Sequence, residues 1–237
     1  MQCDDSSVSQ TYRVTVRAVT NLNARMRRVT VGSDSLAGFA PWPGQDVVLH
    51  LTSADGAGVR RRYTVRSLDP GAHTFDVDFV RHGHGPGAIW AENARPGDEV
   101  EIFGPRGKVP VSDAAWQLFA GDESALPAIA EIVQALPSRT TVTALIEVTD
   151  SDDEQPLKTA AALDVRWIHR APAAAGTSDA LDRAVEQVAV PDDGRHVYLF
   201  GESRAVRRLR DLVSARGVPP VEISAKGYWN LGRDARD

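Results

Sequence analysis

The stretch Arg61-Arg62-Tyr63-Thr64-Val65-Arg66 decides how the first half of this 237-residue chain is interpreted. If it is a strand, Arg61 and Tyr63 lie on one face, because alternate residues of a strand do. A guanidinium can bind a phosphate through forked hydrogen bonds, and an aromatic ring beside it can lie against a flat heterocycle. Thr64 can hydrogen-bond the edge of that heterocycle. An edge strand with solvated arginines is the alternative that these residues leave open.

Short strands surround this stretch. Residues 12–20 alternate apolar with polar side chains, which is the period of a half-buried strand. The turn Asp69-Pro70-Gly71 separates residues 61–67 from 74–82, so these two segments are predicted as neighbours in a hairpin. Further strands are predicted at 25–31, 46–52 and 99–103, and a short helix at 87–93. This spacing predicts a small antiparallel β-barrel.

From residue 112 onward, strands alternate with helices. Residues 140–148 form a continuous β-branched and apolar run, as expected of a parallel strand buried on both faces. The other predicted strands are 115–120, 163–168, 196–200 and 221–224, and the predicted helices are 124–136, 179–188 and 202–215. This alternation predicts a doubly wound parallel sheet. The chain is therefore divided into a flexible tail (1–10), a β-barrel domain (11–111) and an α/β domain (112–237).

Composition restricts the class of protein. The hydrophobic fraction of 42% and the charged fraction of 25% are typical of a soluble globular chain, and the net charge of −5 suggests no nucleic-acid partner. The single cysteine, Cys3, allows no intrachain disulfide and fits a reducing compartment. No apolar run approaches the roughly 20 residues that span a bilayer, so we expect a cytoplasmic protein without membrane insertion. His82 and His84 lack a third ligand nearby, and no bound metal is predicted.

Two loops could bind anions. Gly87 opens a short helix whose N-terminal N–H groups could face a phosphate, and glycine lets a ligand approach the backbone closely. Gly121-Asp122-Glu123-Ser124 lies at a strand-to-helix junction, where α/β domains commonly bind nucleotide phosphates. The negative charges of Asp122 and Glu123 would repel a pyrophosphate, however. Asp122 or Ser124 could instead cap the following helix.

These segments, in this order, resemble the ferredoxin-reductase superfamily. The resemblance is closer to one branch, the siderophore-interacting proteins, which are FAD-dependent ferric-siderophore reductases. Beyond the opening stretch it is carried by residues 76–83, 85–91, 96–100, 104–107 and 121–129, by Gly201-Glu202 and by Gly227-Tyr228-Trp229. It extends from Tyr12 to Gly232.

The resemblance implies a role for individual residues. Tyr63 and Thr64 are the expected catalytic residues. The residues implied to bind FAD are Arg61, Tyr63, Thr64, Val65, His82, Gly85, Pro86, Gly87, Ala88 and Trp90. Those implied to bind NADPH or NADH are Gly121, Asp122, Glu123, Ser124, Gly201 and Glu202. The cationic candidates for contact with an anionic ferric siderophore are Arg62, Arg66, Arg81 and Lys226. The C-terminal segment with Tyr228-Trp229 is implied to return to the flavin.

Several departures from ordinary ferredoxin reductases favour the siderophore branch. The chain lacks their Gly-Thr-Gly loop, and Gly201-Glu202 stands where they carry Cys-Gly, so no active-site thiol is expected. Asn230 stands where the family usually has a basic residue, for which Lys226 and Arg233 are the candidate substitutes.

The identity of the electron donor is left open. Glu147 could hold a ribose hydroxyl and Arg170 could meet a 2′-phosphate, although surface charge is the default interpretation of both. NADH, NADPH and ferredoxin are all retained as donors.

The expected function is FAD-dependent reduction of siderophore-bound Fe(III) to Fe(II) in a monomeric cytoplasmic protein, which releases the iron. Two alternatives stay open. One is a flavin reductase or a ferredoxin–NADP reductase-like electron carrier with a different acceptor. The other is a non-catalytic siderophore-binding protein on the same scaffold.

Overall fold

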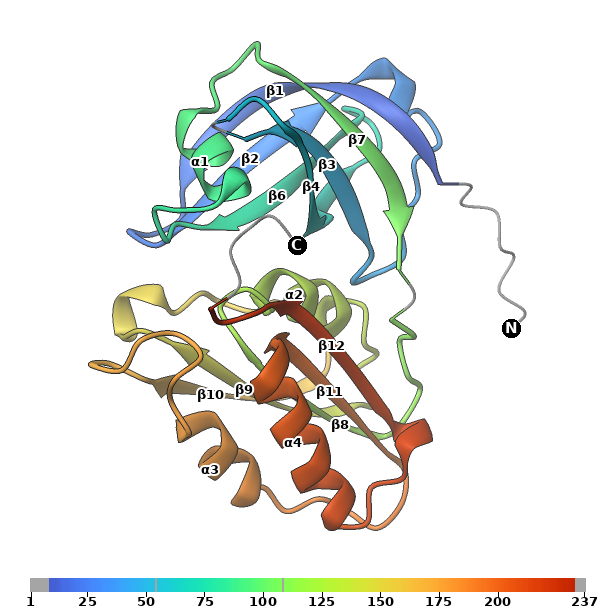
Figure 1. Cartoon of the computed structure of the whole chain (residues 1–237). Coiled ribbons are helices and arrows are strands. Elements are labelled where there is room, and N and C mark those ends of the chain that lie inside the picture. Colours follow the sequence, from blue (N-terminus) through green and yellow to red (C-terminus); the bar gives the residue numbers. More distant parts are fainter. Residues whose placement is uncertain (1–8, 54, 108, 233–237) are drawn as a thin grey trace. The chain divides into compact units, whose positions relative to one another are not determined.

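The computed structural model describes residues 9–53, 55–107 and 109–232. The tail cysteine Cys3 and the candidate base Arg233 lie outside these residues, as does most of the predicted tail. The chain divides into two compact units between Val109 and Pro110 (Figure 1). No helix in these described ranges is long and apolar enough to cross a membrane.

The first unit is a seven-stranded antiparallel sheet that curls into a barrel (Figure 1). Its strand order is β4-β3-β7-β1-β2-β6-β5. The strands are β1 (Gln10–Asn21), β2 (Met26–Gly32), β3 (Asp46–Thr52), β4 (Gly58–Thr64), β5 (Arg66–Asp69), β6 (Thr74–Val80) and β7 (Glu99–Arg106). A 3₁₀ turn, η1 (Asp34–Leu36), and the helix α1 (Pro86–Asn93) belong to the same unit. The predicted antiparallel barrel is confirmed.

The stretch around Tyr63 forms two strands rather than one. β4 ends at Thr64 and β5 begins at Arg66, yet these strands are the opposite edges of the sheet. Val65 alone joins them, and a single residue spans only about 7 Å between its neighbours' Cα atoms. The sheet therefore has to curl until its two edges meet at Val65.

The predicted hairpin is consequently wrong for residues 61–64, which pair with β3. It is right only for Arg66 and Ser67, which belong to β5, the strand that pairs with β6. The reason lies in tertiary contacts that a local pattern does not carry. The Val65 N–H donates to the Gln45 carbonyl oxygen at 2.9 Å, outside the ladder. Ser67 has a φ of 49°, which interrupts regular strand geometry.

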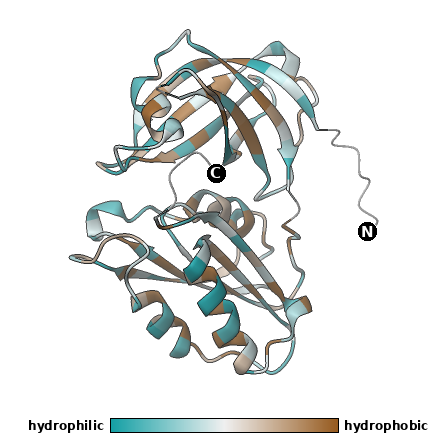
Figure 2. Ribbon diagram, in the orientation of Figure 1, coloured by the Kyte–Doolittle hydropathy of each residue, from teal (hydrophilic) through white to brown (hydrophobic). Residues whose placement is uncertain are grey.

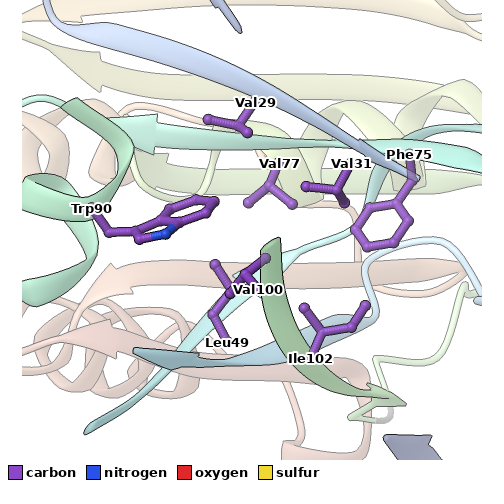
Figure 3. Close-up of a pocket in the computed structure, with 8 residues that line it drawn as sticks. All are labelled: Val29, Val31, Leu49, Phe75, Val77, Trp90, Val100 and Ile102. Carbon is purple, nitrogen blue, oxygen red and sulfur yellow. The ribbon is translucent and has the colours of Figure 1, made fainter. Parts of the chain in front are cut away.

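Buried apolar residues form the core of this unit. Figure 2 colours the ribbon by hydropathy, with hydrophobic residues in brown along the strands. The apolar residues around the centre of the barrel are Val29, Val31, Leu49, Phe75, Val77, Trp90, Val100 and Ile102 (Figure 3). The space between them is too small for a water molecule, so the interior is packed core and offers no room for a ligand. Any ligand of this unit has to bind outside this core.

The second unit is a five-stranded parallel sheet in the order β10-β9-β8-β11-β12. Its strands are β8 (Trp116–Asp122), β9 (Thr141–Val148), β10 (Ala162–His169), β11 (Arg195–Glu202) and β12 (Ile223–Trp229). Its helices are α2 (Leu126–Gln134), α3 (Ala180–Glu186) and α4 (Ser203–Ala215), with the 3₁₀ turns η2 (Ser151–Asp153) and η3 (Pro220–Glu222). The winding direction reverses between β8 and β11, which confirms the predicted doubly wound sheet.

Helices cover both faces of this sheet. α3 and α4 pack together over one face, where Leu181 and Val206 join a cluster with Leu118 of β8 and Leu145 of β9. α2 lies on the other face (Figure 1). Residues 142–148 of β9 are all buried, as the unbroken apolar run predicts.

The last strand is longer than its sequence suggests. The expected strand stops at residue 224, whereas β12 continues through Lys226 and Gly227 to Trp229. Lys and Gly are disfavoured in strands, and the pattern alone therefore ends too early. Gly227 is required here because a Cβ would collide with the Ser203 hydroxyl. The extension brings Tyr228 and Trp229 into the sheet.

Candidate functional site

The two faces of β4 separate the arginines of the opening stretch. Arg60 and Arg62 are exposed, whereas Arg61 and Tyr63 alternate with them and are partly buried. Burial raises the pKa of the Tyr63 phenol to about 12, against the opposing effect of the Arg61 charge. Tyr63 therefore stays protonated at any physiological pH and acts as a hydrogen-bonding group.

Tyr63 is held between the barrel and helix α1. Its ring centroid lies 4.2 Å from that of Phe79, and Phe79 lies 5.5 Å from Trp90 of α1. The hydroxyl rests against Gly87 so closely that a Cβ there would overlap the oxygen and lie 2.8 Å from Cζ. Only glycine fits at this point of α1, and this contact joins the flavin-strand motif to the glycine loop.

The N-terminus of α1 is open to an anion. Gly85 is the N-cap with a φ of 80°, Pro86 follows at the first helical position, and no side chain caps the helix. The N–H groups of the first turn, including those of Gly87 and Ala88, point out of the helix end, where negative charge is favoured. Tyr63 lies against Gly87 at this end of the helix, and Arg61 shares its face of β4. These residues and the first turn of α1 are called the cradle below.

The remaining predicted flavin residues have identifiable local partners. Thr64 ends β4 opposite Asp46, and Val65 is buried after it. The carbonyl oxygen of His82 lies 2.8 Å from His84 Nδ1, and the centroids of the two imidazole rings are 4.2 Å apart. Trp90 points into the barrel core (Figure 3). Among the described residues, no three His, Cys, Asp or Glu side chains gather in a metal-binding group.

The four predicted chelate contacts belong to different elements of the two units. Arg62 lies on the face of β4 opposite to Arg61 and Tyr63. Arg66 begins β5, and Arg81 donates to both carboxylate oxygens of Glu92 in α1 at 3.0 and 2.8 Å, which ties the helix to the end of β6. Lys226 lies in the edge strand β12 of the other unit, with Nζ 5.2 Å from the Tyr228 ring centroid.

In the second unit, Asp122 occupies the point where the sheet reverses its winding. Its Oδ1 accepts hydrogen bonds from the Ser124 N–H (2.9 Å) and hydroxyl (2.5 Å). Its Oδ2 accepts from the Glu202 N–H and from the Trp229 indole N–H, both at 2.9 Å. Burial raises the pKa of this carboxyl, and the neighbouring Glu123 adds to the shift. The side chain thus joins β8, β11 and β12, and its oxygens are used within the protein.

The capping alternative for this loop is wrong. Ala125 is the N-cap of α2 and no side chain caps that helix, because the Asp122 and Ser124 side chains bond to one another. Capping occurs at α4 instead, where Glu202 Oε2 accepts from the N–H groups of Arg204 (2.6 Å) and Ala205 (2.8 Å). Burial alone would raise the pKa of Glu202, but three backbone N–H donors, including that of Leu231, bring it below its usual value.

The glycines of both predicted nucleotide loops have packing reasons. A Cβ on Gly121 would lie 2.7 Å from the Phe200 carbonyl oxygen, and one on Gly201, whose φ is 130°, would lie 2.5 Å from Asp122 Oδ2. Both positions let β8 and β11 approach each other at their carboxyl ends. That edge is where open α/β sheets bind nucleotides.

A second charged group lies at the same edge. Arg170 donates to both carboxylate oxygens of Glu123 at 2.6 Å, and Glu147 lies 3.9 Å from the same guanidinium. Burial raises the pKa of Glu147 to about 7, an effect that Arg170 opposes and the charge of Asp122 reinforces. The two residues that were candidates for the ribose or its 2′-phosphate are thus brought together.

Comparison with known protein families identifies both units. The profile of the siderophore-interacting protein family matches residues 114–232, and that of its FAD-binding domain matches residues 50–109. The chain belongs to the siderophore-interacting protein family. The resemblance inferred from the motifs is therefore confirmed.

Relatives of this siderophore-interacting protein support the assignment. The crystal structure of a siderophore utilization protein from T. fusca has a TM-score of 0.88 and 34% identity, covering 97% of this chain and 96% of that one. A ferric vibriobactin reductase of Vibrio cholerae is 33% identical over 74% of this chain and 66% of its own length. An NADPH-dependent ferric-chelate reductase of Escherichia coli is 28% identical over 92% of both chains. The alignments to curated relatives at 40% and 33% identity span 65% and 66% of those relatives.

Three features of this site were missed from the sequence. The contact of Tyr63 with Gly87, the capping of α4 by Glu202 and the bond from Trp229 to Asp122 all join residues whose pairing has no local signal. The available signal was the selection of Gly87 and Gly201 themselves as candidate binding residues.

Proposed function

We propose that this siderophore-interacting protein is an FAD-dependent NAD(P)H:ferric-siderophore oxidoreductase. The names of the Vibrio cholerae and Escherichia coli relatives support a ferric chelate as substrate and NADPH as donor. The observation that carries the proposal is the cradle in which Tyr63 and Gly87 are in contact. It unites the Arg61–Tyr63 face of β4 with the uncapped N-terminus of α1, and these are the two elements that a dinucleotide-like flavin requires.

The residues of the first unit bind and orient. Arg61 and the first-turn N–H groups of α1 would hold the pyrophosphate of FAD, and Tyr63 and Thr64 would contact its ring system. Because its pKa is raised to about 12, the Tyr63 hydroxyl keeps its proton and serves as a neutral donor. The flavin, when bound, supplies the exchange between a two-electron donor and a one-electron acceptor.

The chelate side of the proposal depends on charge. An anionic ferric siderophore would be attracted by cationic side chains, for which Arg62 and Arg66 are the candidates in the first unit and Lys226 is the candidate in the second. Hard oxygen ligands hold the larger, less charged Fe(II) more weakly than Fe(III). Reduction therefore releases the metal. We propose the cytoplasm as the location, because reduced nicotinamide nucleotides are available there. We further propose a monomer, with ferredoxin as the alternative donor.

The test follows the colour of the bound flavin. Protein loaded with FAD should be yellow, anaerobic NADPH should bleach it, and a ferric siderophore should restore the colour. The variant Arg61→Ala should lose about tenfold or more in FAD affinity, because a charge-assisted bond to phosphate is lost. Arg60→Ala, on the opposite face of the same strand, is the matched control and should bind FAD like the unaltered protein. Failure to bind FAD, or failure of the ferric siderophore to restore the colour, contradicts the proposal.

A further inference from the structure

Arg170 is a buried guanidinium at the carboxyl end of the parallel sheet. It directly follows β10, and its side chain is only 5% exposed. Both terminal nitrogens donate to Glu123 at 2.6 Å, and one also donates to Thr149 Oγ1 at 2.9 Å. Its Nε atom is buried without a hydrogen-bond partner among the described residues. The guanidinium is thus held in place and largely neutralised while one of its donors is unused.

This position matters for a nicotinamide nucleotide. In doubly wound sheets, an acid near the end of the second strand hydrogen-bonds the adenosine ribose, whereas an arginine nearby accommodates a 2′-phosphate. Glu147 is the last residue but one of β9, the second strand of this unit in chain order, and it lies 3.9 Å from the Arg170 guanidinium. The group suited to NADH and the group suited to NADPH therefore stand next to each other.

Glu123 binds the guanidinium of Arg170 through the hydrogen bonds that a phosphate would use. A carboxylate that accepts both terminal N–H groups uses the same fork that binds phosphate oxygens. A 2′-phosphate that bound the same fork of Arg170 would have to displace Glu123, and it would then lie near the charges of Glu123 and Glu147 at a largely buried position. The negative charges at this position disfavour the anionic 2′-phosphate of NADPH more than the uncharged 2′-hydroxyl of NADH.

We propose that Glu123 is a specificity-determining residue for the electron donor. By holding Arg170 it weakens recognition of a 2′-phosphate and lowers the preference for NADPH over NADH. The inference rests on the proposed function, because it requires a nicotinamide nucleotide at this edge of the sheet. It assigns Glu123 to donor selection, in place of a general contact with the nucleotide.

The test compares the affinities of the oxidised FAD-loaded protein for NADP⁺ and NAD⁺ by titration calorimetry, which needs no turnover. Glu123→Gln keeps the shape of the side chain and removes its charge, and it should raise the NADP⁺-to-NAD⁺ affinity ratio about tenfold. Arg170→Gln should lower the same ratio. Glu222→Gln is the matched control, since it weakens another Arg–Glu contact of this unit (Arg195 Nε to Glu222 Oε2, 2.8 Å) and should leave the ratio unchanged.

An unchanged or lowered ratio in Glu123→Gln overturns the inference, and so does an unchanged ratio in Arg170→Gln. If Glu123→Gln does not fold, Glu123→Asp, which keeps the charge, should retain the original ratio while the Arg170→Gln comparison decides the question. Protein that binds neither nucleotide, yet reduces ferric siderophore once its flavin is chemically reduced, also overturns it and leaves the proposed reductase activity standing. Chemically reduced protein that fails to reduce the chelate instead contradicts the proposed function.

Discussion

The contact between Tyr63 and Gly87 gives a quantitative prediction for Gly87→Ala. A Cβ at this position would overlap the Tyr63 hydroxyl oxygen and lie 2.8 Å from Cζ and 3.2 Å from Cε2, where ordinary contacts begin at 3.4 Å. The ring cannot retreat freely, because Phe79 lies behind it at 4.2 Å between centroids. Overpacking of this severity costs about 3 kcal/mol. Alanine recovers about 1 kcal/mol of helix propensity, which leaves a net loss of about 2 kcal/mol in the free energy of unfolding.

The assay is urea unfolding of the FAD-free protein, together with fluorescence titration of FAD. The affinity for FAD should fall as well, because a displaced Tyr63 alters the cradle. Gly58→Ala is the matched control: it lies at the start of the same strand, β4, nothing is within 4 Å of its Cβ, and it should change stability by less than about 0.5 kcal/mol. Adding Tyr63→Phe to Gly87→Ala removes the overlapping oxygen and should restore part of the lost stability. Equal stability of Gly87→Ala and Gly58→Ala, or no recovery in the double variant, would refute the packing argument.

Three further predictions concern the second unit. Glu147 has a pKa raised from its usual 4.5 to about 7, so the folded state binds its proton more tightly and the stability that this group contributes is lost as pH rises from about 4.5 to about 7. Glu147→Gln should remove this loss, on the order of 2 kcal/mol, from the difference between unfolding free energies at pH 5 and pH 8, and parallel pH profiles of the two proteins would show the reasoning to be wrong. Asp122→Asn should destabilise by about 2 kcal/mol in urea unfolding, because an amide cannot accept from all the donors that now bond to the two carboxylate oxygens; an unaltered midpoint would contradict this. Trp229→Phe keeps an aromatic ring but loses the indole donor to Asp122, so it should cost about 1 kcal/mol, whereas Trp167→Phe in β10 is the comparison in which no such bond to Asp122 is lost.

Elements whose pattern reflects their own burial were predictable. Residues 142–148 of β9 are buried on both faces, and their unbroken apolar run indicates this directly. The alternation of Arg60 and Arg62 with Arg61 and Tyr63 follows from strand geometry, and the structure shows the expected difference in exposure. Motif order was sufficient for the family, because both family profiles cover the segments on which the resemblance rested.

Features that depend on distant partners were not predictable. Asp122 stands before a helix, which locally suggests a cap, but one of its partners is Trp229, 107 positions along the chain. Arg170 looked like a free cation after a strand, whereas Glu123, 47 positions earlier, binds it. The division of residues 61–67 into β4 and β5 likewise depends on Gln45, which lies in neither strand. In each case, a local rule gave one plausible partner and the fold supplied another.

The junction at Val65 has a consequence for where a cofactor can be recognised by the main chain. Elsewhere in this sheet a strand has neighbours on both sides, and its peptide groups are used by the ladder. Among the described residues, β4 and β5 each have a strand neighbour on one side only, so strand pairing does not use the peptide groups on their other sides. Beside Tyr63 and Thr64 the main chain is therefore fixed by strand pairing on one side only. Substitutions of side chains at the junction of β4 and β5 would therefore change the surroundings of Tyr63 and Thr64 without changing the main-chain hydrogen-bonding groups.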